Sequence, residues 1–95
     1  MWIAALRLQF SIPGARSLKD KRRVIKSIAD RLRNDFPVAV AETDFQDTWN
    51  RAEIGIAAVG NDTRFLNSML DSILERLRKH PVAILADEDR ESFGL

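Results

Sequence analysis

The sequence predicts an α+β fold, a ferredoxin-like split βαβ sandwich in which an antiparallel sheet carries two helices on one of its faces. Apolar side chains alternate in four segments and recur at helical spacing in two others. These segments follow one another in the order β-α-β-β-α-β. We therefore expect residues 1–95 to form a single ferredoxin-like domain, with a permuted α+β sandwich as the alternative.

The first half of the chain contains a strand, a helix and a second strand. Residues 2–10 alternate in side-chain character, which is typical of a strand. Ser17 followed three residues later by Asp20 is close to a capping box, so we expect the first helix to start there. Pro37 ends this helix, because the residue before a proline is disfavoured in the α region. A strand over residues 38–44 follows.

The second half of the chain is also predicted to contain a strand, a helix and a strand, in that order. Residues 45–50 are predicted to form a turn between the second strand and a third strand at 51–59, which makes a hairpin. Asn61 or Asp62 caps the second helix, and His80-Pro81 closes it. A last strand is predicted over 82–87, just before the acidic segment "DEDRE".

Composition favours a folded protein of the cytoplasm. The 95 residues are 45% hydrophobic and 31% charged, with no cysteine for a disulfide or a thiolate metal site. No apolar run approaches the roughly 20 residues that span a bilayer, and Arg7 interrupts the apolar start, so neither a membrane segment nor a signal peptide is predicted.

Charge is distributed unevenly along the chain. Residues 1–48 contain nine Lys/Arg and six Asp/Glu, whereas residues 49–95 contain six and eight, although the formal net charge is only +1. Six cations lie between Arg16 and Lys26, with Asp20 as the one acid among them. This local concentration of positive charge is the feature that a function has to explain.

The sheet face away from the helices is predicted to be small and apolar. If Leu6, Leu8, Ile54, Ile56 and Ile84 face the helices, the opposite face presents Ile3, Ala5, Ala39, Ala41, Gly55, Ala57, Ala83 and Leu85. A solvated face would alternate to polar side chains, so we expect a second copy of the chain to cover it. The alternative is a monomer in which Arg7, Gln9, Thr43, Glu53 and Asp87 provide enough polar surface.

The first helix has a basic flank. At about 100° per residue, cations gather along one side of its apolar arc. Together with free N–H groups at the helix N-terminus they form a candidate site for RNA or another polyanion. The residues predicted to bind are Arg16, Ser17, Lys19, Lys21, Arg22, Arg23, Lys26 and Arg33. The alternative is that these long side chains only solvate the helix.

Lys21 is unusual within this set, because its angle falls inside the apolar arc. It is expected to fix a loop carbonyl, to pair with Glu42 or Asp44, or to reach a ligand.

Structured RNA is the polyanion that we favour. RNA-recognition motifs of this fold stack bases on aromatic residues of the central strands, but the third strand, "RAEIGIAAVG", has none. Contacts to the backbone of folded or double-stranded RNA are then expected, without readout of a DNA sequence.

Few residues suggest catalysis. Glu42, Asp44 and Asp47 could hold Mg²⁺ or transfer protons, although such groups more often cap a turn and pair with nearby cations. Trp49 is expected to anchor the hairpin connection in the core, with a binding role as the alternative, and His80 to act as a capping cation. The glycine-rich loop and third-strand asparagine of acylphosphatases are missing. We predict no enzyme activity, catalytic residue, metal or cofactor.

The segment from Ser17 to Asp62 resembles the YlxP-like family of small bacterial proteins. The matching residues are Ser17-Leu18-Lys19, Lys21-Arg22, Phe36, Val40-Ala41-Glu42, Gln46-Asp47, Trp49, Arg51-Ala52 and Gly60-Asn61-Asp62. The resemblance implies a ferredoxin-like fold and genes that lie among those for transcription and ribosome maturation. The family has no established catalytic residue, so none is transferred.

Three hypotheses follow from the sequence. The first is a non-enzymatic cytoplasmic accessory protein that binds structured RNA or a ribosomal subunit through the basic helix. The second is a homodimeric module that binds another protein. The third, an enzyme acting on a small molecule or through a metal, would need Glu42, Asp44 and Asp47 to bind Mg²⁺.

Overall fold

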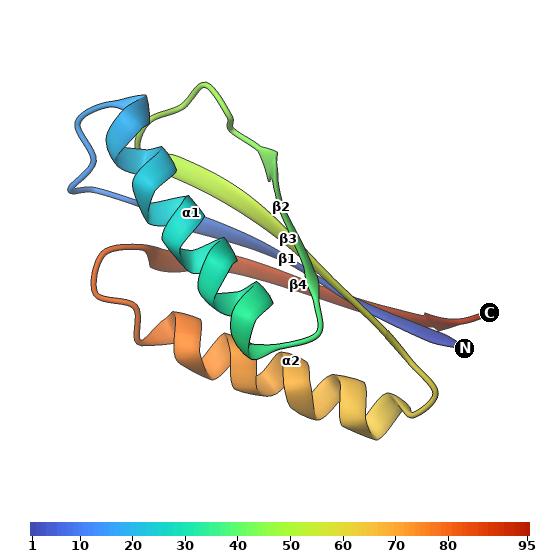
Figure 1. Cartoon of the computed structure of the whole chain (residues 1–95). Coiled ribbons are helices and arrows are strands. Elements are labelled where there is room, and N and C mark those ends of the chain that lie inside the picture. Colours follow the sequence, from blue (N-terminus) through green and yellow to red (C-terminus); the bar gives the residue numbers. More distant parts are fainter.

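The computed structural model describes all residues from 1 to 95, and its elements follow the predicted order β-α-β-β-α-β (Figure 1). The elements are β1 (Trp2–Ser11), α1 (Leu18–Asp35), β2 (Ala39–Asp44), β3 (Arg51–Gly60), α2 (Thr63–Arg78) and β4 (Ile84–Gly94). The predicted α+β ferredoxin-like arrangement is confirmed.

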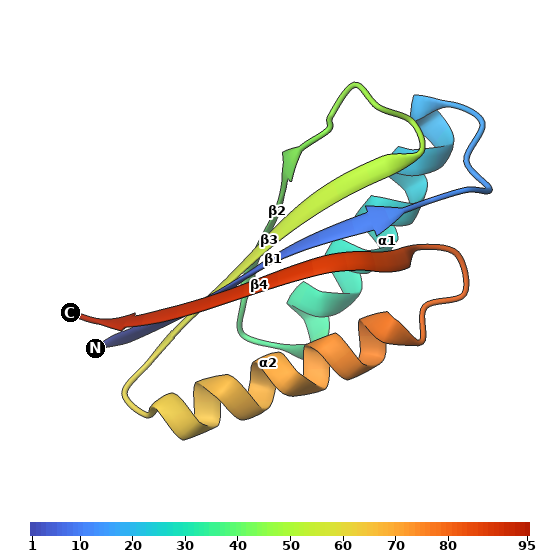
Figure 2. The same cartoon turned by 180° about the vertical axis from the view of Figure 1, so that it is seen from behind.

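The four strands form one antiparallel sheet in the order β2-β3-β1-β4. Both helices lie on the same face of this sheet, and the view from behind shows the other face without a helix over it (Figure 2). We call this uncovered side the open face. The two chain ends are neighbours, because the first residue of β1, Trp2, pairs with the last residue of β4, Gly94.

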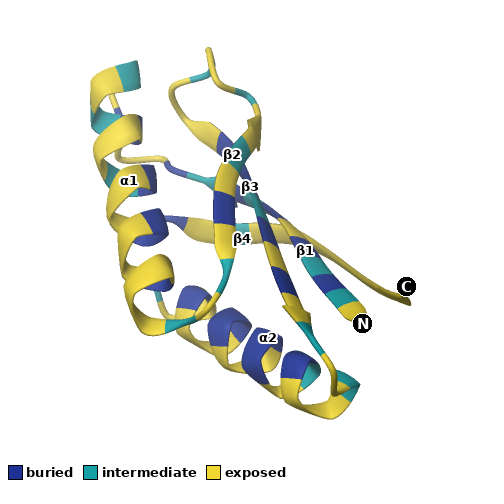
Figure 3. Cartoon of the chain, turned by 45° about the vertical axis from the view of Figure 1, so that its right-hand side comes forward, coloured by how far each residue is buried: buried dark blue, intermediate teal, exposed yellow.

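The core lies between the helices and the sheet. Each helix turns a buried stripe toward the strands and an exposed side outward (Figure 3). Alternate residues of the central strands complete this core, and the predicted inward positions Leu6, Leu8, Ile54 and Ile56 are all buried. Neither helix is long and apolar enough to cross a membrane.

Side-chain caps fix where the helices begin. The Ser17 hydroxyl accepts a hydrogen bond from the Asp20 N–H at 3.1 Å, and the Asp20 carboxylate accepts one from the Arg16 N–H at 3.0 Å. These two bonds give the reciprocal cap that the sequence predicts. Asp62, one of the two predicted candidates, caps α2 by accepting from the Arg64 N–H at 2.9 Å.

The last strand departs from the prediction in both length and orientation. It extends to Gly94, through the acidic segment, instead of ending at residue 87. Ala83 is 1% exposed and Leu85 packs against the core, whereas Ile84 is 55% exposed. The assignments of Ala83 and Leu85 to the open face, and of Ile84 to the helix side, were therefore wrong. His80 causes this orientation, because its ring Nδ1 holds the N–H groups of Val82 and Ala83.

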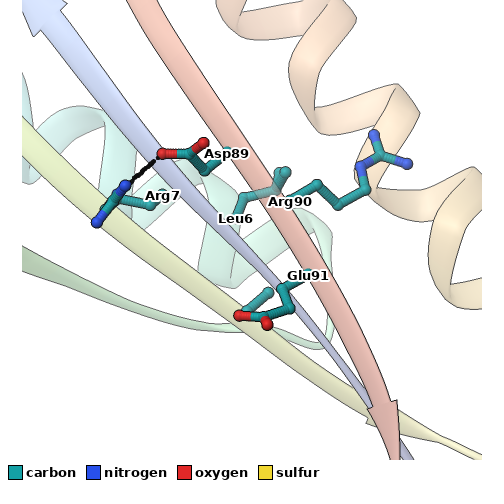
Figure 4. Close-up of a pocket in the computed structure, with 6 residues that line it drawn as sticks. Leu6, Arg7, Asp89, Arg90 and Glu91 are labelled. Carbon is teal, nitrogen blue, oxygen red and sulfur yellow. Dashed lines mark hydrogen bonds and ion pairs between the residues drawn. The ribbon is translucent and has the colours of Figure 1, made fainter.

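A bulge then changes the alternation of β4. Gln9 pairs with Asp87 and Phe10 with Leu85, which leaves Ala86 as an extra residue. Beyond it, Asp89 points to Arg7 on the open face, whereas Arg90 points across β4 toward α2 (Figure 4). Ion pairs on both sides of the strand thus stabilise a segment that has no apolar pattern.

Candidate functional site

The start of α1 is an exposed basic surface. Arg16, Lys19, Arg22 and Arg23 are all exposed, and none of them forms an ion pair within the chain. We call these four side chains the basic flank. They stand beside the N-terminal end of α1, where the helix dipole is also positive. The arrangement concentrates positive charge without an ion pair in the molecule, and Asp20 is the one acid in the same turn of the helix.

Further along the helix, the predicted cations are already paired. Asp30 lies 2.7 Å from the Lys26 ammonium and 3.5 Å from the Arg33 guanidinium. The hydrogen bond from Lys26 holds the pKa of Asp30 below its ordinary value. Arg33 also donates to the Val40 carbonyl on β2 at 2.5 Å. Lys26 and Arg33 therefore contribute less free charge to the surface than the basic flank does.

Lys21 is inside the protein, with 0% of its side chain exposed. Its ammonium donates to the Phe45 carbonyl at 2.6 Å, with the Gln46 carbonyl at 3.4 Å, and it lies 2.9 Å from Glu42 Oε2. Two of the uses expected for Lys21, fixing a loop carbonyl and pairing with Glu42, are thus found. Its assignment to the anion-binding residues was wrong, because a side chain enclosed by its own partners cannot contact RNA.

The pair between Lys21 and Glu42 is mainly electrostatic. Glu42 Oε2 is enclosed and lies off the direction of a good hydrogen bond, although the ammonium is within contact distance. Removal of Lys21 would leave a buried carboxylate oxygen without any partner. Lys21 consequently joins α1 to the turn that connects β2 and β3.

A groove runs between α1 and the edge strand β2. Its volume is about 390 Å³, and Arg22, Lys26 and Arg33 line it from the helix side. Val40, Ala41 and Glu42 line it from the strand. The basic flank therefore continues into a hollow that is open to solvent.

The turn at residues 45–50 is held at several points. Phe45 has a positive φ of 61°, and its ring lies under the Arg51 guanidinium at 4.2 Å. The Asn50 carbonyl accepts from the Ile12 N–H at 2.9 Å. Trp49 is 47% exposed, so its expected place in the core was wrong. A large aromatic side chain is instead presented to solvent on a turn that Lys21 ties to α1.

The three carboxylates of this region do not form a metal site. Glu42 pairs with Lys21, and Asp44 accepts a hydrogen bond from the Phe45 N–H at 2.7 Å. No group of three His, Asp or Glu side chains has an arrangement that could hold a metal ion. Glu42 and Asp44 act within the turn, as the alternative interpretation of the sequence expected, and no partner is found for Asp47.

His80 is a hydrogen-bond acceptor and not a capping cation. Its Nδ1 accepts from the N–H groups of Val82 at 3.1 Å and Ala83 at 2.9 Å. A protonated ring has no lone pair at Nδ1 for these bonds. Burial and the charge of Arg31 lower the pKa of His80 below 6.5. The neutral ring is therefore the form that the fold uses, and the predicted role was wrong.

The open face is apolar at one end and polar at the other. Ala39, Ala41, Ala57 and Val59 are exposed along β2 and β3, and Phe93 is exposed on β4. Toward the other end, Glu53 accepts hydrogen bonds from Gln9 and Thr43. Sequence reasoning missed Phe93, although the alternation of Asp89, Glu91 and Phe93 at every second residue could have placed the three side chains on one face.

An ion pair occupies the middle of the open face. Arg7 on β1 and Asp89 on β4 pair across the two strands and, with Glu91, line an open hollow of about 490 Å³ (Figure 4). The hydrogen bond to Asp89 raises the pKa of Arg7 above its already high ordinary value, so this guanidinium does not transfer protons.

Comparison with known proteins places the chain in a family. The family described as "Protein of unknown function (DUF503)" matches residues 3–90. The chain belongs to this DUF503 family. One relative is the "Uncharacterized protein YlxP" of Bacillus subtilis (strain 168), which is 40% identical over 67 residues that cover 70% of this chain and 73% of the relative. The resemblance to YlxP-like proteins is confirmed, and the family description assigns no activity to DUF503 proteins.

Proposed function

We propose that this DUF503 protein is a non-enzymatic accessory protein of the cytoplasm that binds structured RNA of the small ribosomal subunit or its precursor. The observation that carries the proposal is the basic flank of Arg16, Lys19, Arg22 and Arg23, which is exposed and has no acidic partner. The sites of contact are these four side chains and the groove that Arg22 shares with β2.

The physical basis is the release of counterions from the RNA backbone. Each cation that neutralises a phosphate frees a condensed counterion, so binding weakens as the salt concentration rises. Exposed cations without a partner contribute fully, because no internal ion pair has to break first. The mutual repulsion of the four side chains in the free protein also decreases when an anion binds.

The test compares two pairs of cations that carry the same charge. Arg22→Gln with Arg23→Gln removes two cations from the basic flank, and Arg64→Gln with Arg78→Gln removes two exposed cations from α2. Binding to purified small-subunit ribosomal RNA is measured over a salt series. The first variant is expected to bind less tightly, and the slope of log affinity against log salt is expected to decrease by about 2.

The second variant serves as the control for net charge. It is expected to keep the affinity and the salt slope of the wild-type protein. Equal losses in both variants would mean that binding follows overall charge and not the basic flank, and the proposal would be abandoned. Unfolding curves of both variants confirm that the fold is intact.

A second proposal concerns the open face, which we propose is covered by a second copy of the chain. The observation that favours it is the uncovered apolar surface formed by Ile3, Ala5, Ala39, Ala41, Gly55 and Ala57, continued by Val59 and Phe93. Exposed apolar surface of this kind marks interaction sites. Such a dimer would present two basic flanks to one RNA, or serve as a protein-binding module without RNA.

Sedimentation equilibrium tests the dimer. Ala57→Glu places a charge on the open face and is expected to yield a monomer, whereas Ser68→Glu, on the exposed side of α2, leaves the mass unchanged. A wild-type protein that sediments as a monomer at all concentrations would rule out this role of the open face.

A further inference from the structure

A hollow between α1 and the end of α2 is lined by basic side chains. Its volume is about 160 Å³, and it lies on the flank of α1 opposite to the groove with β2. The polar side chains that line it are Ser27, Arg31, Arg76, Lys79 and His80. No acidic residue is among the lining residues. The basic flank of the proposed RNA surface contributes none of these residues.

The cations of this hollow differ in how they are neutralised. Arg76 pairs with Asp35 at 2.5 Å, and Lys79 pairs with Glu75 at 3.3 Å. Arg31 forms no ion pair. The hollow therefore contains one cation without an ion pair beside two that are paired, which favours an anionic ligand at Arg31.

His80 supplies a hydrogen-bond donor to the same hollow. Because Nδ1 accepts from two backbone N–H groups, the ring proton of the neutral form is on Nε2. The positive charge of Arg31 lowers the pKa of this ring in addition to the effect of burial. The ring thus experiences the positive potential of the site, and Arg76 and Lys79 are the other charged groups that line it.

We propose that this hollow binds a single phosphate group, with Arg31 as the main charged ligand and with Ser27, Lys79 and His80 as further donors. The named donors come from α1 and from the two residues that follow α2, and such a set of separate donors suits a tetrahedral anion with several oxygens more than a planar carboxylate. The dipole of α2 opposes an anion at its C-terminal end, so affinity depends on the side chains and not on the backbone. A free phosphate ester and the backbone of RNA share this chemistry.

The single histidine of the chain gives a direct measurement. Its NMR titration curve is recorded with inorganic phosphate and with chloride at the same ionic strength. A bound dianion stabilises the protonated ring, so phosphate is expected to raise the pKa of His80 in a saturable way. An unchanged titration curve at saturating phosphate would overturn the proposal.

Two substitutions test whether the change that phosphate causes in the pKa of His80 arises in this hollow. Arg31→Gln is expected to weaken phosphate binding at least about tenfold, because it removes a charge-assisted contact. Arg31→Gln is also expected to raise the pKa of His80 in the absence of phosphate. The quantity compared between variants is therefore the change in the pKa of His80 when phosphate replaces chloride. Arg64→Gln, which removes an exposed cation at the other end of α2, is expected to leave that difference unchanged. Full retention of binding by Arg31→Gln would also overturn the proposal.

Two further titrations identify the source of the phosphate. A sugar phosphate that acts like inorganic phosphate would support a small-molecule ligand. An RNA duplex that shifts the pKa of His80, and loses this effect in Arg31→Gln, would identify the group as an RNA phosphate. A shift with RNA that Arg31→Gln leaves unchanged would exclude the hollow as its cause.

Discussion

Helix α1 contains seven Lys and Arg residues and α2 contains three, and the two helices use their cations differently. In the first turns of α1, Lys19, Arg22 and Arg23 are exposed without acidic partners. In the last turns of α2, Arg76 pairs with Asp35 and Arg78 pairs with Glu88. Arg76 and Arg78 also lie at the end of α2 where the helix dipole stabilises positive charge, whereas Lys19, Arg22 and Arg23 lie at the end of α1 where it does not.

The difference separates cations that support the fold from cations that are free to bind. On α2, each pair links the helix to a neighbouring element, since Asp35 belongs to α1 and Glu88 to β4. Among the cations of α1, Lys21 is the one that pairs with an acid of another element, and it is buried, while Arg33 donates to the Val40 carbonyl of β2. The proposed RNA contact therefore rests on the cations at the start of α1 that have no ion pair, and not on positive charge by itself.

The largest expected effect on stability comes from replacing Lys21, the buried cation in the first turns of α1. Lys21→Met leaves Glu42 Oε2 enclosed without its counter-charge and frees the Phe45 carbonyl. We expect the free energy of unfolding to decrease by about 3 kcal/mol. Urea denaturation measures this loss.

Lys19→Met is the matched control, because it makes the same substitution two residues away at an exposed position. It is expected to change stability by less than about 0.5 kcal/mol. If the two variants were equally stable, Lys21 would not be the connection between α1 and the turn.

Smaller effects on stability are expected when an acid is placed at the start of α1 or at the end of α2, and the two effects are expected to have opposite signs. Lys19→Glu places an acid in the first turn of α1 and is expected to stabilise the protein by about 0.5 kcal/mol. Arg78→Glu places an acid in the last turn of α2, opposite Glu88, and is expected to destabilise it by about 1 kcal/mol. Thermal unfolding at low salt measures both, and a destabilised Lys19→Glu would contradict the role assigned to the dipole.

The smallest effect concerns His80, the uncharged neighbour of the paired cations at the end of α2. Its folded-state pKa is below 6.5, so the unfolded chain binds more protons between the folded value and 6.5. Stability is therefore complete above 6.5 and decreases as the pH falls through this interval. Asp30 and Asp35, whose pKa values are below 3.8, add their own loss only in more acidic solution.

His80→Asn tests this assignment, because the side-chain oxygen of asparagine can accept the same two backbone N–H groups without titrating. The variant is expected to fold at neutral pH and to lose the decrease in stability just below 6.5. Urea denaturation on both sides of this pH gives the comparison, and an unchanged decrease would mean that another group titrates.

Sequence patterns predicted the elements whose two sides differ in polarity. Both helices and the first three strands have a clear period, and the cap at Ser17 follows from residue types that bond locally. In these cases the determining contacts lie within one element or one turn. The position of Lys21 in the apolar arc also raised contact with a loop carbonyl and pairing with Glu42 or Asp44 among its possible uses, and the structure has the first together with the pair to Glu42.

The remaining features depend on contacts that no local pattern shows. The acidic end of β4 pairs with β1 through the backbone, and Arg7 on β1 and Asp71 on α2 add ion pairs to its residues from opposite sides. The inward position of Ala83 depends on the ring of His80. The phosphate-sized hollow joins Arg31 to residues almost fifty positions later in the chain, a distance over which periodicity carries no information.

The connection made by Lys21 has a consequence for binding. Because it ties α1 to residues 45 and 46, the helix start and the turn that carries Trp49 form one preorganised body before any partner arrives. Association would then lose little conformational entropy in the backbone. Only the ends of arginine and lysine side chains would then have to become ordered on the RNA that we propose, which lowers the entropic cost of association.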